Sequence, residues 1–346
     1  MSTTAGVFSE TQLYNLQLKA DAEWAERIQI EDANANVSFL QGLISKIQTA
    51  RLVTKFRNKK DIIAEISWIN ACDITDQACT NCDIDGTELS TNIKEYQLDI
   101  CREASFQASE ADFLDNTYDI EEVLAKGFIE ANNELDEYLA QQAIATINAA
   151  GGRNELGTVG QKVVSGITGD TSIPPAYWNA SLMGYLARVA IMSRFESPHL
   201  FSGHNLFEQL WNAEKDQYNA DGKGNWLKFG SMDVNFDLFN VDTVNTPDLI
   251  TYMVNKGAFA IANKAYYDGK TAASPAVFFD SKRWSIPSRN LPGIMYDVHY
   301  KSDCEDGNDF YNHRFKLKVN AGMFINPVGC TEDRTGILRF VCETAE

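Results

Sequence analysis

The chain has 346 residues, of which 44% are apolar and 23% are charged. This ordinary globular balance excludes a largely disordered chain, and the length allows one large domain or two modest ones. Because 30 Lys and Arg stand against 48 Asp and Glu, the formal net charge is -18. That is the wrong sign for a protein that gathers nucleic acid by neutralising phosphates, although a basic pocket can still exist locally.

The first 58 residues predict two helical stretches between Glu10 and Arg57, separated by the turn-like residues 32–36. Apolar residues recur at helical spacing in both stretches, which predicts one apolar stripe on each. The stripes consist of Leu13, Leu16, Ala20, Trp24 and Ile28, and of Phe39, Leu43, Ile47 and Leu52. We expect arm-like helices whose stripes need a surface to pack on.

Residues 61–101 predict a long hairpin. Residues 62–68 are mostly apolar, and Tyr96, Leu98 and Ile100 alternate with polar residues, as strands do. The segment between them is polar and includes Asp83-Ile84-Asp85-Gly86, which suits a loop that lies on another surface.

A long helix is the clearest predicted element. Asp119 is a good N-cap with Glu122 at the N3 position, and Gly151 is a C-terminal stop. One side of this helix is apolar and the other carries most of its carboxylates. The apolar positions are Leu124, Phe128, Ala131, Leu135, Leu139 and Ile147.

The second half predicts a mixed helix and sheet domain. Helices are expected from Ala176 through Leu186 and from Asn205 to Asp216. Strands are expected where apolar and polar residues alternate, and Gly336 to Cys342 predicts a short final strand. The alternating residues are Met232, Val234, Phe236 and Leu238; Tyr296, Val298 and Tyr300; and Phe315, Leu317 and Val319. The whole chain therefore predicts an α+β fold.

No enzyme motif is present in the sequence. The four histidines are His199, His204, His299 and His313, and none has metal-ligand spacing. The nucleophile elbow, the phosphate loop and the dinucleotide fingerprint are all missing. Residues 219–225 resemble a calcium loop but lack its bidentate Glu, so we interpret them as a turn. We predict no catalytic residue and no organic cofactor.

Four cysteines form the best chemical signal: Cys72, Cys79, Cys82 and Cys101. A hairpin can bring four thiolates together, and the Cys79-x-x-Cys82 pair has the right bite for a tetrahedral structural zinc. The alternative is that these are buried free thiols, the usual state of cysteine in a reducing compartment. A zinc here would hold the base of the hairpin and would not act in catalysis.

Five short stretches resemble one protein family. They are Cys82-Asp83-Ile84-Asp85-Gly86-Thr87-Glu88-Leu89, Asp99-Ile100-Cys101-Arg102, Pro198 through Leu206, Leu291 through Asp297, and Gly329 through Phe340. With the order of elements, they resemble the major capsid proteins of tailed bacteriophages, and the wording is most similar to those of phages that infect Bacteroidota. The family fold, named the Hong Kong 97 type, also occurs in encapsulins.

The resemblance implies a division of the chain. Residues 1–58 would be an N-terminal arm and 59–104 an extended hairpin loop. Residues 105–195 would form a peripheral domain with a spine helix at 119–150, and 196–325 an axial domain. Residues 326–346 would form a C-terminal strand that returns to the peripheral domain.

The implied function is structural. Copies of the chain would form hexamers and pentamers of an icosahedral shell, which is the capsid of the virion. The shell would assemble in the host cytoplasm, without membrane contact. It would enclose DNA as non-specific cargo. Separate scaffold and portal proteins are expected partners, auxiliary capsid proteins are further candidates, and no cross-link through Lys59, Lys60 or Lys94 is expected. The alternatives are an encapsulin-like compartment and a cytosolic zinc-dependent enzyme. If the arm packs only on neighbours, removing residues 1–30 leaves folded subunits that cannot close shells.

Overall fold

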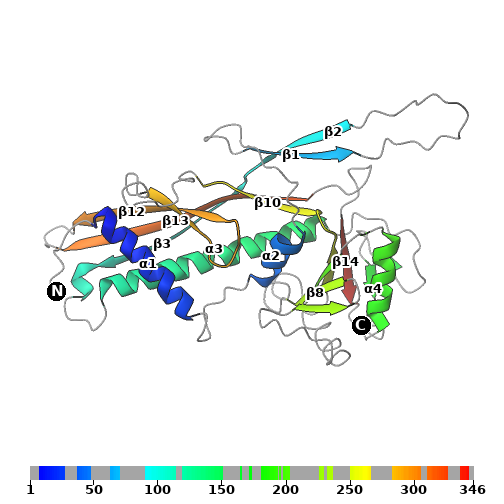
Figure 1. Cartoon of the computed structure of the whole chain (residues 1–346), viewed down its shortest axis with the longest axis horizontal. Helices are drawn as coiled ribbons and strands as arrows, with labels where there is room; N and C mark the ends of the chain where they lie inside the picture. Colours follow the sequence, from blue (N-terminus) through cyan, green and yellow to red (C-terminus); the bar gives the residue numbers. More distant parts are fainter. Residues whose placement is uncertain are drawn as a thin grey trace, which may run out of the picture. The chain divides into compact units, whose positions relative to one another are not determined.

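The computed structural model describes residues 8–27, 37–47, 63–70, 90–113, 119–150, 164–165, 171–173, 181–193, 195, 198–202, 226–229, 232–236, 250–265, 283–304, 310–325 and 336–342 (Figure 1). The chain divides into two compact units, and neither is continuous in sequence. Unit 1 comprises Met1–Val37, Leu98–Leu139 and Asn263–Ala321, and unit 2 comprises Ser38–Gln97, Ala140–Ala262 and Gly322–Glu346. The predicted axial range 196–325 is therefore divided between the two units.

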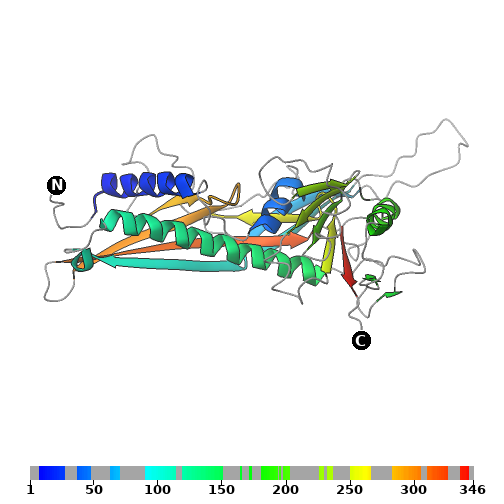
Figure 2. The ribbon, with the colours of Figure 1, turned by 90° about the horizontal axis from the view of Figure 1, so that it is seen from below.

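Unit 1 is built around an antiparallel sheet on which two helices pack. Strand β13 pairs with β12 and with β3, and β12 pairs with β11. Helix α1 lies beside the N-terminal part of α3, as Figure 2 shows, with Lys19 Nζ 3.8 Å from Glu122 Oε1. The elements with all or most of their residues in unit 1 are α1 (Glu10–Arg27), β3 (Ile100–Ser109), η2 (Glu110–Phe113), α3 (Ile120–Ala150), β11 (Arg283–Pro287), β12 (Met295–Cys304) and β13 (Tyr311–Ile325).

Aromatic packing joins α3 to this sheet. The Phe128 ring on α3 meets Phe106 and Phe315 edge-on, at centroid distances of 5.1 and 5.0 Å. Phe106 and Phe315 are directly opposite in the register of β3 and β13 and stack at 5.3 Å. Gly127 permits this close approach, because a Cβ at this position would lie 2.5 Å from the Phe106 ring.

Unit 2 contains a seven-stranded sheet in the order β4-β5-β14-β9-β6-β8-β7. Consecutive residues of a strand point to opposite faces of the sheet. The side-chain contacts of two consecutive residues of β9 therefore show which helix covers each face. Met253 packs in the cluster that contains Leu186 of α4, whereas the Tyr252 ring lies 6.3 Å from Phe39 of α2. Helix α4 therefore covers one face and α2 the other.

The remaining elements complete unit 2 and its hairpin. Strands β1 and β2 form a separate two-stranded antiparallel sheet. Strand β10 pairs with β13. The elements are α2 (Ser38–Gly42), η1 (Leu43–Ile47), β1 (Ile63–Asn70), β2 (Ser90–Gln97), β4 (Val164–Ser165), β5 (Thr171–Ile173), α4 (Ser181–Met192), β6 (His199–Ser202), β7 (Trp226–Phe229), β8 (Met232–Phe236), β9 (Ile250–Val254), β10 (Phe259–Asn263) and β14 (Ile337–Cys342).

Most predicted elements are confirmed where the structure describes them. The apolar stripe of α3 is buried at every predicted position, and the final strand forms as β14, between β5 and β9. The prediction of one strand through Tyr96, Leu98 and Ile100 is wrong, because β2 ends at Gln97 and β3 begins at Ile100 in a different sheet. The predicted helix at 205–216 lies outside the described residues. No helix within the described ranges is both long and apolar enough to cross a membrane.

Candidate functional site

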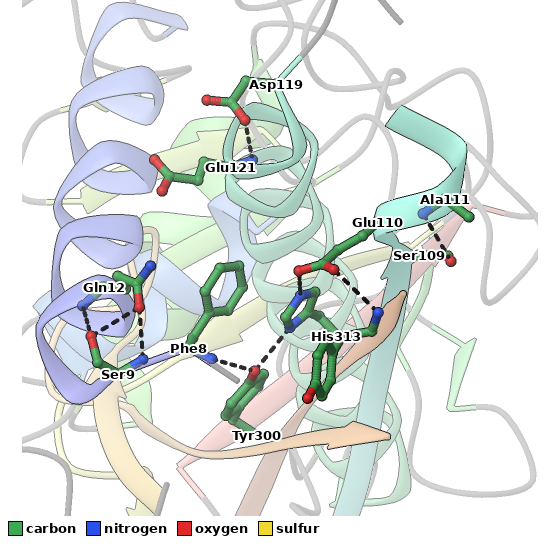
Figure 3. Close-up of polar contacts among 11 residues, drawn as sticks. Phe8, Ser9, Gln12, Ser109, Glu110, Ala111, Asp119, Glu121, Tyr300 and His313 are labelled. Carbon is green, nitrogen blue, oxygen red and sulfur yellow. Dashed lines mark hydrogen bonds and ion pairs between the residues drawn. The ribbon is translucent and has the colours of Figure 1, made fainter. Parts of the chain in front are cut away.

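The beginning of α1 is held against the sheet of unit 1 by a polar and aromatic cluster (Figure 3). The Phe8 ring stacks on the His313 ring at a centroid distance of 4.0 Å, and the Phe8 N–H donates to the Tyr300 hydroxyl at 3.2 Å. Ser9 caps the helix, since its Oγ accepts from the Gln12 N–H at 3.3 Å while its own N–H donates to Gln12 Oε1 at 2.9 Å. This reciprocal pair is a capping box.

His313 connects this cluster to the end of β3. Its Nε2 lies 3.2 Å from Glu110 Oε1, and its Nδ1 lies 2.9 Å from the Tyr300 hydroxyl. The consistent assignment is that Nε2–H donates to Glu110 and that Nδ1 accepts from Tyr300, whose oxygen accepts from Phe8. Glu110 also accepts the Tyr311 N–H at 3.2 Å.

A carboxylate, an imidazole and a hydroxyl joined in series by hydrogen bonds resemble a proton relay, but no substrate can reach this series. His313 is fully buried and is covered by Phe8. Burial lowers the pKa of His313 despite the opposing Glu110 charge, and burial raises the pKa of Tyr300. Because a general base must reach a substrate proton, the cluster serves to hold α1 in place.

Further contacts continue along α1. The Trp284 indole N–H on β11 donates to Gln17 Oε1 at 3.0 Å, and the Arg289 guanidinium pairs with Asp21. Leu13, Leu16 and Ala20 of the predicted stripe are at most 2% exposed. The surface that this stripe needs is therefore supplied by unit 1 of the same chain.

The second half of the predicted arm packs in the same way on unit 2. Phe39, Leu43 and Ile47 are fully buried. The Asn235 side chain donates to the Ser38 carbonyl at 2.9 Å. The expectation that the arm packs on neighbouring copies and leaves its own body is thus wrong for residues 8–27 and 37–47, because their apolar stripes are already covered by their own chain.

A second polar cluster surrounds Asp136, which is fully buried on α3. Its carboxylate accepts from Asn132 Nδ2 at 2.7 Å, Ser288 Oγ at 2.7 Å and Asn290 Nδ2 at 2.8 Å, and also from the Tyr296 hydroxyl. Burial raises the pKa of Asp136, and these four hydrogen bonds oppose that rise. The cluster fixes the turn between β11 and β12 on α3, so its role is structural.

That turn, residues 288–294, overlaps one of the stretches that resemble capsid proteins, residues 291–297. Gly293 has a φ of 85°, in the left-handed region that favours glycine. The Leu291 side chain is fully buried, and its N–H donates to Ser288 Oγ at 2.9 Å. Turn geometry therefore accounts for Gly293, and the hydrogen bond from Tyr296 to Asp136 joins this stretch to α3.

The cysteine site remains a prediction. Cys72, Cys79 and Cys82 lie outside the described residues, and Cys101 is exposed on β3. The alternative of buried thiols is wrong for the cysteines whose side chains the structure describes, since Cys304 is exposed as well. Within the described residues, no group of three or more His, Cys, Asp or Glu side chains is placed to bind a metal.

Sequence reasoning missed both polar clusters. The helix start had a readable signal, because Ser9-Glu10-Thr11-Gln12 matches the capping-box pattern. Glu110 and His313 are separated by 203 positions, so only the pairing of β3 with β13 brings them together. Asp136 looked like one more solvated carboxylate on an acidic helix, and nothing local marks it as buried.

Comparison with known proteins gave structural neighbours alone: no family model and no curated protein matches the chain. Against the Cyanophage A-1(L) capsid asymmetric unit, the TM-score is 0.48 at 12% identity, covering 87% of this chain and 91% of that one. The capsid of Ralstonia phage GP4 has a TM-score of 0.47 and 10% sequence identity, and the match covers 88% of this chain and 92% of that chain. The structure from Mycobacterium phage Adephagia has a TM-score of 0.47 and 11% sequence identity, and the match covers 92% of this chain and 94% of that chain. TM-scores and sequence identities this low do not assign a function. The function has to be inferred from the chain itself.

Proposed function

We propose that this chain is the major capsid protein of a tailed phage, with the Hong Kong 97 type of fold, most similar to the capsid proteins of phages of Bacteroidota. Copies form hexamers and pentamers of an icosahedral head that encloses double-stranded DNA, and the protein catalyses no reaction. Five sequence stretches that resemble this family support the proposal, together with the order of helix, hairpin, long helix and mixed sheet along the chain.

The hairpin carries the proposal. Eight residue pairs join β1 to β2, from Ile63 with Gln97 to Asn70 with Ser90. In the described part of the chain, these two strands pair only with each other. An isolated two-stranded hairpin is marginally stable in water, so this ribbon needs a further surface.

A neighbouring copy supplies that surface in our proposal. Within its own chain the hairpin contacts unit 2 through Tyr96, whose ring centroid lies 4.3 Å from that of Phe324. Obligate interfaces bury about 2,000–5,000 Å² in total, and an extended ribbon adds contact area without enlarging the compact body. Scaffold and portal proteins are separate partners, the DNA is bound without sequence specificity, and the finished protein resides in the virion after assembly in the host cytoplasm.

Replacing residues 71–89 by Asn-Gly tests the proposal. This pair favours the two-residue turn that joins antiparallel strands, and Asn70 and Ser90 are already paired across the hairpin. We expect a subunit with unchanged thermal unfolding that no longer closes shells in negative-stain electron microscopy. Ile191→Ser is the control, since this side chain on α4 is 77% exposed and its loss should leave shells intact. Normal shells from the shortened hairpin would refute the proposed role.

A further inference from the structure

A basic pocket lies on the sheet of unit 1. Arg314 and Lys316 flank Phe315, whose ring packs on Phe128 of α3, so both cations lie on the opposite face of β13. The pocket has a volume of about 690 Å³, and its lining contains Arg283, Lys301, Arg314 and Lys316 with no Asp or Glu. In a chain of net charge -18, such a surface is unexpected.

The register of the sheet places like charges side by side. Lys301 is directly opposite Arg314, and His299 lies between Arg283 and Lys316 on the neighbouring strands. Like charges in directly opposite positions destabilise a sheet. Asp303 contacts both Lys301 and Arg314 and offsets part of this repulsion, and an anionic partner would offset more of it.

Besides the buried Asp297, two carboxylates lie beside the pocket cations, and each is shared between two cations. Glu103 lies 3.3 Å from Lys316 Nζ and 4.0 Å from Lys318 Nζ. Asp303 lies 2.8 Å from Lys301 Nζ and 3.5 Å from Arg314 Nη1. With Lys318 included, five cations face these two carboxylates and Asp297, which leaves an excess of positive charge.

His299 lies among the same charges. Burial lowers the pKa of His299 most, and the positive charges of Arg283 and Lys316 lower it further against the single opposing charge of Asp297. The cationic side chains are also accessible, since Lys301 is 73% and Arg314 52% exposed. The pocket thus combines positive potential with open access.

We infer that this face of the sheet binds the phosphate backbone of duplex DNA and therefore lines the interior of the shell. The inference rests on the proposed capsid function. Ser105 and Gln107 add polar side chains to the lining, and phosphate oxygens are commonly bound by Arg and Lys together with such groups. Carboxylates elsewhere on the chain weaken this attraction little, because charges more than about 10 Å away are screened at 0.1 M salt.

The overall acidity limits how strongly each copy binds. Four lining cations can displace few counterions, so the logarithm of the binding constant should fall with the logarithm of salt concentration at a slope of about -3.6. Many copies in one shell add such weak contacts together. The DNA is therefore retained near the wall and remains free to slide.

The test uses the full chain and a fluorescent 20-base-pair duplex, with binding measured by anisotropy from 20 to 200 mM NaCl. The pocket variant is Arg283→Gln/Arg314→Gln/Lys316→Gln. The control variant removes the same charge elsewhere in the described chain, through substitution of three cations that do not line the pocket: Lys126→Gln, Arg188→Gln and Lys256→Gln. Circular dichroism verifies that both variants fold.

We expect the pocket variant to bind the duplex at least about tenfold more weakly at 50 mM salt, with a slope near -1, and the control to stay within about twofold of the original. Equal losses in both variants, or no binding by the original protein, would overturn the inference. Pocket-dependent binding of polyglutamate without DNA binding would assign the face to an acidic protein segment. Binding of tripolyphosphate alone would assign it to a small phosphate compound.

Electron microscopy of the same samples separates the two proposals. Closed shells from a protein that does not bind the duplex would sink the DNA inference and leave the capsid function standing. Pocket-dependent DNA binding by a protein that forms no shells under any condition would support DNA binding and refute the capsid function. The assignment of an interior face would then be refuted as well.

Discussion

Substituting Leu16 by Ala in α1 tests whether this helix belongs to its own subunit. Leu16 is 2% exposed and lies in the same stripe as Leu13 and Ala20, which are each 1% exposed. Truncating a buried leucine costs about 2–5 kcal/mol, from lost burial and from the cavity that remains. Since whole domains are stable by about 5–15 kcal/mol, we expect Leu16→Ala to lower the free energy of unfolding by about 3 kcal/mol.

The matched control is Leu18→Ala, two residues along the same helix, because Leu18 is 47% exposed. An exposed substitution should change the free energy of unfolding by only about 0.5 kcal/mol. Urea unfolding of the unassembled chain, at two protein concentrations, measures both variants. Equal and small effects would contradict the packing of α1 on unit 1, and an effect that grows with concentration would show that α1 packs on a neighbour instead.

The same reasoning changes the expected result of a larger truncation. Removing residues 1–30 would expose Trp284, which is 1% exposed, and the buried His313 ring that stacks on Phe8. We therefore expect a partly unfolded unit 1, in place of the folded but assembly-deficient subunits that the sequence alone indicates. Hydrogen exchange in β11 and β13 distinguishes these results, because uncovered strands lose protection.

Four shorter predictions follow from single sites. Gly127→Ala should lower stability by about 1–3 kcal/mol, because its Cβ would overlap the stacked Phe106 ring; a thermal midpoint that rises would contradict this. Asp136→Asn should lower the free energy of unfolding by about 3 kcal/mol in urea, because an amide accepts at one oxygen where four donors converge; an unchanged midpoint would sink the buried-carboxylate argument. Burial lowers the pKa of His199 to about 4, so the folded state stays neutral while the unfolded chain gains a proton below pH 6.5, and stability should fall by about 2 kcal/mol from pH 7 to 5; His199→Gln should lose this part of the pH dependence. If the four cysteines bind zinc, elemental analysis should find one metal per chain that is lost in Cys79→Ser, and metal-free protein would end that hypothesis.

Local patterns predicted the elements well where periodicity was strong. The stripe of α3 from Leu124 to Ile147 is buried as predicted, because a helix of this length repeats its apolar face many times. The hairpin was predicted with its second strand too long, since Leu98 and Ile100 continue the alternation of Tyr96 across the break after Gln97. Period-two alternation marks a strand but does not say which sheet it joins.

The candidate sites were much less accessible from the sequence. The basic pocket draws Arg283, Lys301 and Lys316 from three different strands, and each is an unremarkable surface charge in its own segment. Asp136 resembles the other acids of α3 in its local sequence. It differs in its partners, because Ser288 and Asn290 of the turn after β11 donate hydrogen bonds to it. Such sites depend on contacts between distant segments, which no local pattern reports.

The sequence by itself determined the α+β class, the long helix, the hairpin and the absence of known enzyme motifs, because these depend on local periodicity, caps and short spacings. Only the tertiary structure decided that α1 packs on its own unit 1, that unit 1 and unit 2 each combine three separate segments, and that cations from three strands meet on one face. The physical reason is strand pairing: the register of β3 and β13 sets residues more than 200 positions apart side by side.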